Sequence, residues 1–234
     1  MRFYNALAIA ATILAVSGCA TQPAVPPPTY PGLEQSSTVV IKDLRPKTEA
    51  EKKIFSLLVT SSAYGIYRVA DSATDPTGPR LLTHRAYESF PALAMQPAIN
   101  VRHFVTYANM QSHLRKASLG AAFGGPIGAH LMTRSAPPVG QVLSTQIDAT
   151  LIDQTAEDEH VRAYYSEEEN PEKSPVNVIY IDAEILGQRV ASRCLVPPLA
   201  DRPHLFLVEA FDMCIAKHLA FYQEDRFQVA ASNK

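Results

Sequence analysis

Two carboxylates, Asp182 and Glu184, are spaced so that they share one face of an expected strand. Paired carboxylates can act as acid and base in hydrolysis, but such positions on a half-buried sheet are more commonly solvated, and we interpret them in this way. The seven histidines are scattered along the chain and lack the paired spacing of a metal site. Phosphate-binding glycine loops and nucleophile elbows do not occur. The sequence therefore predicts no catalytic residue, no cofactor and no metal ligand.

Cys194 and Cys214 are two of the three cysteines in the chain. Cys194 falls near the end of an expected strand and Cys214 in the following expected helix, so a helix that packs back on its own sheet could bring them together. A disulfide requires their Cα atoms to come within about 7 Å. The sequence leaves open whether the two residues form this bond or stay as separate buried thiols.

The third cysteine, Cys19, ends a segment that has the parts of a secretory signal in the right order. A positive charge at Arg2 precedes an apolar run over residues 6–16, and small residues follow at Ser17 and Gly18. The run is much shorter than the ~20 residues of a transmembrane helix. The pattern Val16-Ser17-Gly18-Cys19 resembles the lipobox of bacterial lipoproteins.

The lipobox resemblance implies that residues 1–18 are a signal peptide and that the Cys19 thiol receives a diacylglyceryl group after export. It further implies acylation of the new amino terminus, for example with palmitate, and two or more acyl chains suffice for stable anchoring. Ala20, where an aspartate would favour the inner membrane, implies sorting to the outer membrane. Beyond the lipobox, the mature domain resembles small α/β envelope lipoproteins only in general character.

Composition divides the rest of the chain into a tether, a domain and a tail. Residues 19–37 contain five prolines between positions 23 and 31, and proline neither continues a helix nor donates to a sheet, so we expect an extended tether. The globular domain is expected over residues 38–224 and a tail over 225–234. The formal net charge is −2, so no basic surface for nucleic acid is expected. The expected partners are the membrane, through the lipid, and an envelope protein.

The pattern of apolar residues predicts both strands and helices in the domain. The expected strands span residues 38–41, 64–69, 99–107, 143–151, 176–185 and 189–196. The expected helices span residues 48–58, which begin with a capping-box spacing at Thr48 and Glu51, 79–96 and 204–222. The last two strands form a hairpin through Leu186-Gly187-Gln188. This order predicts an α+β fold in a single domain, with a mixed, largely antiparallel sheet of about six strands and packed helices.

One further segment, Ala117 to Thr133, contains no Asp, Glu, Lys or Arg. Glycine recurs at every fourth position from 120 to 128, a spacing that lets helices approach closely in membranes, although Pro126 interrupts it. The largest apolar side chains also recur at four-residue intervals and could form an interface: Leu119, Phe123, Ile127 and Leu131. A glycine-rich loop packed within the domain is the other interpretation.

These observations predict a periplasm-facing lipoprotein of the outer membrane that acts as a binding or scaffolding module in the cell envelope. The alternative is an envelope hydrolase whose active site is assembled from residues distant in the sequence. A deep polar cleft with converging Asp, Glu or His side chains would favour the hydrolase. A flat or apolar exposed patch would favour the binding module.

Overall fold

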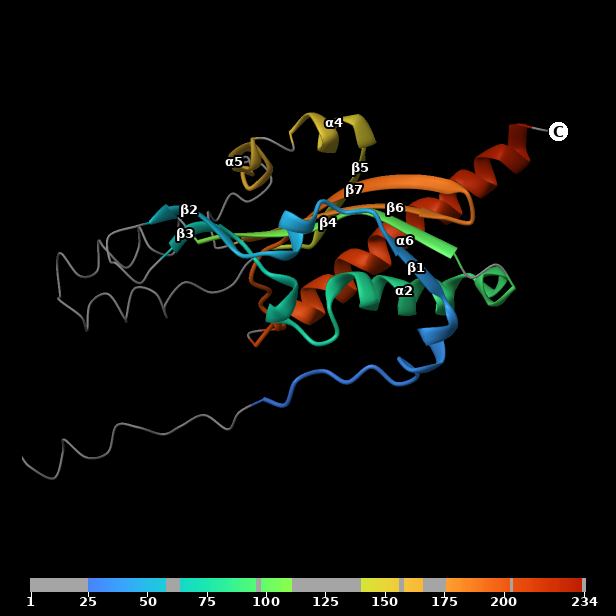
Figure 1. Ribbon diagram of the computed structural model, residues 1–234, viewed down its shortest axis with the longest axis horizontal. Coiled ribbons are helices and arrows are strands. Elements are labelled where there is room, and N and C mark those ends of the chain that lie inside the picture. The colour runs from blue at the N-terminus through green and yellow to red at the C-terminus, as the bar shows by residue number, and fades with distance from the viewer. Residues whose placement is uncertain are drawn as a thin grey trace, which may run out of the picture.

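The computed structural model describes seven stretches of the chain, residues 25–57, 64–95, 98–110, 140–155, 158–165, 176–202 and 204–232. They form a single α+β domain around a seven-stranded, largely antiparallel sheet. In Figure 1 the sheet is the middle layer, with α2 and α6 on one side and the short helices α4 and α5 on the other. The predicted fold class is therefore confirmed, with one strand more than the expected six or so.

The sheet has the strand order β2-β3-β4-β6-β7-β5, and β1 adds to one edge of β4. The bounds are β1 Val40–Asp43, β2 Lys53–Leu57, β3 Tyr64–Arg68, β4 Ala98–Asn109, β5 Leu143–Ile147, β6 Val176–Ile185 and β7 Gln188–Val196. Among the described strands, only the β1–β4 pair is parallel, and the other pairs are antiparallel. β6 runs along one edge of β4, while β1 and β3 share the other edge.

The α-helices are α2 Gly78–Ser89, α4 Ala149–Gln154, α5 Glu159–Arg162 and α6 Leu207–Ser232. Short 3-10 helices are η1 Gln35–Thr38, η2 Lys47–Ala50, η3 Asp71–Ala73 and η4 Pro91–Ala94. α6 extends well into the predicted tail, because no glycine or proline interrupts it. No helix in the described part of the chain is both long and apolar enough to span a bilayer.

The main core lies between the sheet and the helices α2 and α6. Phe104 of β4 packs edge to face on Phe211 of α6, with ring centroids 5.3 Å apart. A smaller core lies on the other face, beneath α4 and α5, and contains Val105 and Tyr107 of the same strand. β4 is therefore buried on both faces, whereas the alternation of apolar residues from Ile99 to Tyr107 in the sequence is typical of a strand with one apolar face.

The structure corrects the prediction of a helix over residues 48–58. Thr48 lies in η2, and the chain then continues into β2, which pairs with β3. Ile54, Leu57 and Leu58 stand at helical spacing in the sequence and would form the buried stripe of such a helix, but Ile54 is 42% exposed. Three apolar residues at helical spacing are a weak signal, and pairing with β3 satisfies the backbone groups of this segment instead.

The predicted strand over residues 143–151 also ends earlier, at Ile147. The Asp148 side chain accepts a hydrogen bond from the backbone N–H of Thr150 and caps α4 at this point. The β6–β7 hairpin turns through Leu186 and Gly187 with φ angles of 53° and 83°. Positive φ at both turn residues matches the right-handed twist of the two strands.

The N-terminal segment makes contacts with the domain before Thr38. Ser36 is fully buried and accepts a hydrogen bond from Arg80 of α2. Tyr30 packs against the main core, its hydroxyl donates to the carbonyl of Val208, and Arg85 lies over its ring. The last part of the proline-rich segment therefore rests on the first turns of α6.

Candidate functional site: polar clusters on the two faces of the sheet

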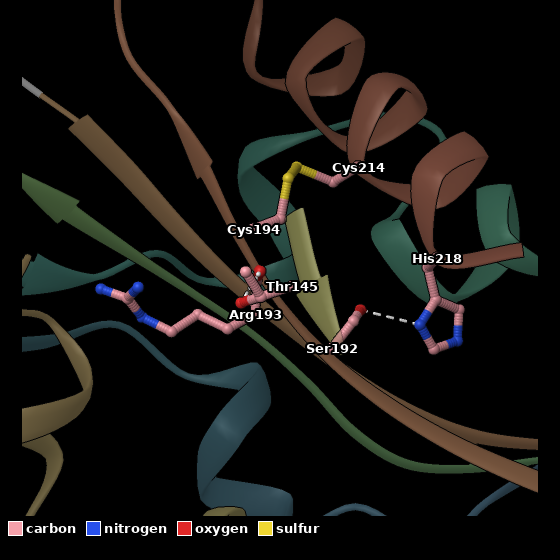
Figure 2. The surroundings of a disulfide bond; sticks show 6 residues. All are labelled: Thr145, Ser192, Arg193, Cys194, Cys214 and His218. Carbon is pink, nitrogen blue, oxygen red and sulfur yellow. Dashed lines mark hydrogen bonds between the residues drawn. A yellow bond between two sulfur atoms is a disulfide. The ribbon is translucent and has the colours of Figure 1, made fainter. Parts of the chain in front are cut away.

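A disulfide joins Cys194 of β7 to Cys214 of α6 within the main core (Figure 2). Both residues are fully buried, and their Cα atoms are 5.8 Å apart. The two possibilities that the sequence left open are therefore decided by packing, because α6 lies directly on the strand that carries Cys194. The bond fastens the C-terminal helix to β7, the strand next to one end of the sheet.

Ser192 and His218 lie beside this disulfide and face each other across the same interface (Figure 2). The Ser192 hydroxyl and His218 Nδ1 are 2.8 Å apart. On the other side of the ring, Nε2 is 3.5 Å from the hydroxyl of Tyr222, which itself donates to the carbonyl of Ala183. Because the Tyr222 proton is engaged there, its oxygen accepts from Nε2–H and Nδ1 accepts from Ser192.

A serine hydroxyl that donates to a histidine nitrogen is the arrangement of a nucleophile and its base. In this protein, however, both Ser192 and His218 are fully buried between the sheet and α6. Burial lowers the pKa of His218 to about 3, and Tyr222 rather than a carboxylate stands at its second nitrogen. The pair therefore acts as an interior hydrogen bond. Sequence reasoning missed it because the partners are 26 residues apart on two elements.

The opposite face of the sheet carries a cluster of charged side chains centred on His103, in which His103, Glu49 and Arg162 are buried and Asp153 is exposed. His103 lies between two carboxylates, with Nδ1 2.7 Å from Glu49 Oε1 and Nε2 3.1 Å from Asp153 Oδ1. Burial disfavours the charged imidazole, but the hydrogen bonds and negative charges of Glu49 and Asp153 outweigh it and raise the pKa of His103. Both ring nitrogens therefore act as donors, and neither is free to accept a proton from a substrate.

Arginine side chains complete this cluster from the neighbouring elements. Arg162 of α5 lies 3.3 Å from Glu49 and donates to Thr155 and to the backbone carbonyl of Ile152 at the end of α4. Arg189 of β7 donates to Asp182 at 3.0 Å. The cluster thus connects η2, α4 and α5 to the sheet.

A second group of charges lies around Glu159 of α5. Its carboxylate is 2.6 Å from Arg68, 2.8 Å from Lys53 and 3.0 Å from the hydroxyl of Tyr107. Burial alone would raise the pKa of Glu159, but the hydrogen bonds from Lys53, Arg68 and Tyr107 lower it, so the group is ionised. α5 is a single short turn, and these bonds supply much of its attachment to β2, β3 and β4.

The structure corrects the interpretation of Asp182 and Glu184 as a solvated pair. Asp182 is fully buried, and Arg189, which stands opposite Glu184 in the hairpin register, reaches diagonally across to donate to its carboxylate. Glu184 instead faces Arg102, 3.5 Å away. The two carboxylates therefore serve different arginines and do not converge. Within the described residues, no group of three or more His, Cys, Asp or Glu side chains is placed to hold a metal ion.

An open hollow of about 550 Å³ lies where the N-terminal segment meets the beginning of α6. Apolar side chains of the proline-rich segment form one wall, and charged side chains around the start of the helix form the other. Its lining residues are Val25, Pro26, Pro28, Asp201, Arg202, His204, Phe206 and Glu209. Arg202 and Glu209 form an ion pair at 3.3 Å within it.

The remaining residues singled out from the sequence lie outside the described part of the chain. They are Cys19 and the four apolar residues Leu119, Phe123, Ile127 and Leu131. The charged clusters, in contrast, were not predicted. The only sequence signal for them was the alternation that places His103 on the same strand face as Val105 and Tyr107, and nothing in the sequence indicated Glu49 or Asp153.

Comparison of the chain with protein-family models, with curated proteins and with solved structures finds no match.

Proposed function

We propose that this chain is a lipoprotein of the bacterial outer membrane whose periplasmic domain binds or scaffolds another component of the cell envelope. The observation that carries the proposal is the Cys194–Cys214 disulfide in the core, because disulfides form and persist in oxidising compartments outside the cytoplasm. It fits the signal segment that ends at Cys19, since an exported chain meets such a compartment. The lipid on Cys19 would then hold the domain at the membrane.

Anchoring is tested by the substitution Cys19→Ser. Labelling with a radioactive fatty acid should mark the wild-type chain and not the variant, and the variant should leave the membrane fraction. The matched control replaces both Cys194 and Cys214 by alanine, which removes two sulfur atoms but keeps the acceptor. Equal incorporation into wild type and Cys19→Ser would contradict the proposal.

Binding is favoured over hydrolysis by the state of the two histidines that resemble catalytic groups. His218 and Ser192 are sealed between the sheet and α6, and His103 uses both nitrogens on carboxylates. The hollow at the start of α6 is, by contrast, open to solvent and has both apolar and charged walls. A site of this kind suits recognition of a polypeptide that presents both apolar and charged groups.

Partner capture is tested by placing a photo-crosslinking residue in the full-length chain in intact cells. His204 is exposed and lines the hollow, and Lys217 is an equally exposed control further along the protein on α6. We expect one defined crosslinked protein from position 204 and none from position 217. Capture of the same proteins at both positions, or at neither, would contradict a binding site in the hollow.

The charge-free segment Ala117–Thr133 is a second proposed contact region. Replacing Phe123 and Ile127 by serine should abolish partner capture and leave thermal unfolding nearly unchanged if these side chains are exposed in the free protein. A large drop in the unfolding temperature would place them in the core instead and would refute the interface.

An envelope hydrolase is the alternative, and the contact between Ser192 and His218 is the one observation that favours it. An active-site serine reacts with fluorophosphonate probes. The binding proposal expects no labelling of Ser192 in the folded protein. Labelling that disappears in Ser192→Ala would favour the hydrolase.

A further inference from the structure

Strand β5 forms one end of the sheet and pairs only with β7 among the described strands. In Figure 2 its residue Thr145 lies beside Arg193 of β7. All five residues of β5 pair in register without a bulge, so its outer edge presents a regular row of backbone donors and acceptors. Such an edge is a template for another strand.

Proteins usually protect an edge strand with charged residues, proline or a bulge. The strands at the other end of this sheet follow that rule, since β1 contains Lys42 and Asp43 and β2 contains Lys53 and two register shifts. The sequence of β5, Leu-Ser-Thr-Gln-Ile, has none of these features. Leu143 and Thr145 are both exposed.

Among the described residues, those that flank β5 on either side do not run along its outer edge. After β5 it turns at Asp148 into α4, which lies over the face of the sheet and buries Ile152 in the smaller core. Before β5, Val142 packs against the main core, and Gly140 lies against Pro197 just beyond β7. These neighbouring residues of β5 therefore lie over the sheet or toward β7.

The residue pattern of β5 is complementary to itself in the antiparallel direction. If a second copy pairs with its centre at Thr145, Leu143 faces Ile147 of the other copy and Thr145 faces Thr145. Apolar side chains then meet apolar ones, and threonine pairs are among the favourable cross-strand combinations. Ser144 faces Gln146, so two hydrogen-bonding side chains meet, and no charges are opposed.

We infer that β5 is a self-association edge, and that two copies of this chain pair their β5 strands antiparallel about Thr145. The two seven-stranded sheets then continue into one sheet across a two-fold axis, which is the commonest symmetry of homo-oligomers. Because only five residues of each copy pair, the interface is small, and small interfaces give weak, concentration-dependent association. We assign a second copy of this chain to the edge because the side chains of β5 are complementary to those of another β5 in the antiparallel direction.

The register is tested by cysteine crosslinking of the full-length chain at position 145. Thr145→Cys places two thiols opposite each other on the two-fold axis, so mild oxidation should give a dimer joined by a 145–145 disulfide, identified by peptide mass. Leu143→Cys is the matched control, because the two copies of residue 143 are four residues apart in this register, about 13 Å, which is beyond disulfide reach. We expect at least tenfold less dimer from it. A mixture of Leu143→Cys and Ile147→Cys chains should crosslink where neither does alone.

Association without crosslinking is measured by sedimentation of the full-length chain in detergent over a range of concentrations. Thr145→Lys puts two like charges opposite each other and should shift the protein to monomer, while Thr150→Lys on α4 adds the same charge away from the edge and should not. Thr145 is exposed and its hydroxyl makes only a 3.5 Å contact with the carbonyl of Arg193, so its replacement should leave thermal unfolding unchanged. Equal crosslinking at positions 143 and 145, or a wild-type chain that is monomeric at every concentration, would overturn the inference.

Discussion

Breaking the Cys194–Cys214 disulfide should lower the free energy of unfolding by about 3 kcal/mol. The bond closes a loop between residues 20 positions apart in the sequence. In the chain-entropy model a loop of this length restricts the unfolded chain by about 3 kcal/mol at 25 °C. Both residues are fully buried in the main core, so the same change also removes the covalent link between α6 and the strand on which it packs.

The assay is urea unfolding followed by circular dichroism, with a thermal scan beside it. One kcal/mol corresponds to about 2–4 °C for a domain of this size, so the unfolding temperature should fall by about 6–12 °C. Two samples separate the loss of the crosslink from the loss of side-chain volume in the core. Reduced wild type keeps both sulfur atoms and loses only the crosslink, whereas the Cys194→Ala, Cys214→Ala variant also loses their volume. The variant should be slightly less stable than reduced wild type and insensitive to reductant.

A loss of less than about 1 kcal/mol in the reduced wild type would refute this reasoning. It would mean that residual structure already restricts the loop between the two cysteines in the unfolded ensemble. A reductant effect on the double variant would show that the measured change comes from somewhere other than this bond.

Three further predictions concern buried titratable groups. The pKa of His103 in the folded state is raised above its usual 6.5, so the stability that its protonation contributes is complete below pH 6.5 and is lost as the pH rises through the folded pKa. The difference in unfolding free energy between wild type and His103→Gln, measured in urea, should therefore shrink from pH 6 to pH 9, and an unchanged difference would contradict this prediction. The pKa of His218 is lowered to about 3, so the free energy of unfolding of wild type should fall by about 1.4 kcal/mol per pH unit below pH 6.5, because only the unfolded state binds the proton there. His218→Gln should flatten this dependence of stability on pH, and equal slopes in both proteins would argue against a neutral buried ring. Asp182→Asn should lower the free energy of unfolding by about 3 kcal/mol because it leaves Arg189 without its buried partner, and the double variant with Arg189→Gln should recover part of this loss. If the effects of the two single substitutions simply add in equilibrium unfolding, the two residues are not coupled and the prediction is refuted.

The regular elements of the domain were predictable because their information is local. The helix from Pro79, the strand around Val105 and the β6–β7 hairpin each follow from apolar periodicity and turn residues within about ten positions. The same local rules failed over residues 48–58. There, pairing of β2 with the next strand β3 outweighs a short helical pattern, and Glu49 is used by His103, which lies 54 residues further along the chain.

The candidate sites show the same division. Val16-Ser17-Gly18-Cys19 is a contiguous motif, so the proposal of a lipidated Cys19 rests on the sequence alone. The Ser192–His218 contact and the carboxylates on His103 depend on which elements lie side by side, and partners 26 to 54 residues apart leave no spacing pattern. Arg189 is only 7 residues from Asp182, but the burial of Asp182 depends on the elements packed over the sheet. A charged residue on the polar face of a predicted strand is expected to be solvated unless its cross-strand neighbour is known.

By itself, the sequence determined the near-neutral charge, the single α+β domain and most of its elements. It also carries the proposal of an export signal, because this motif, like the elements, is encoded in neighbouring residues. Only the tertiary structure decided whether Cys194 and Cys214 are bonded and which face of the sheet carries buried charges. It also decided which strand ends the sheet. The physical reason is that bond formation, desolvation and edge exposure are properties of chain segments brought together in space, and the free energy of each depends on the neighbour that packing supplies.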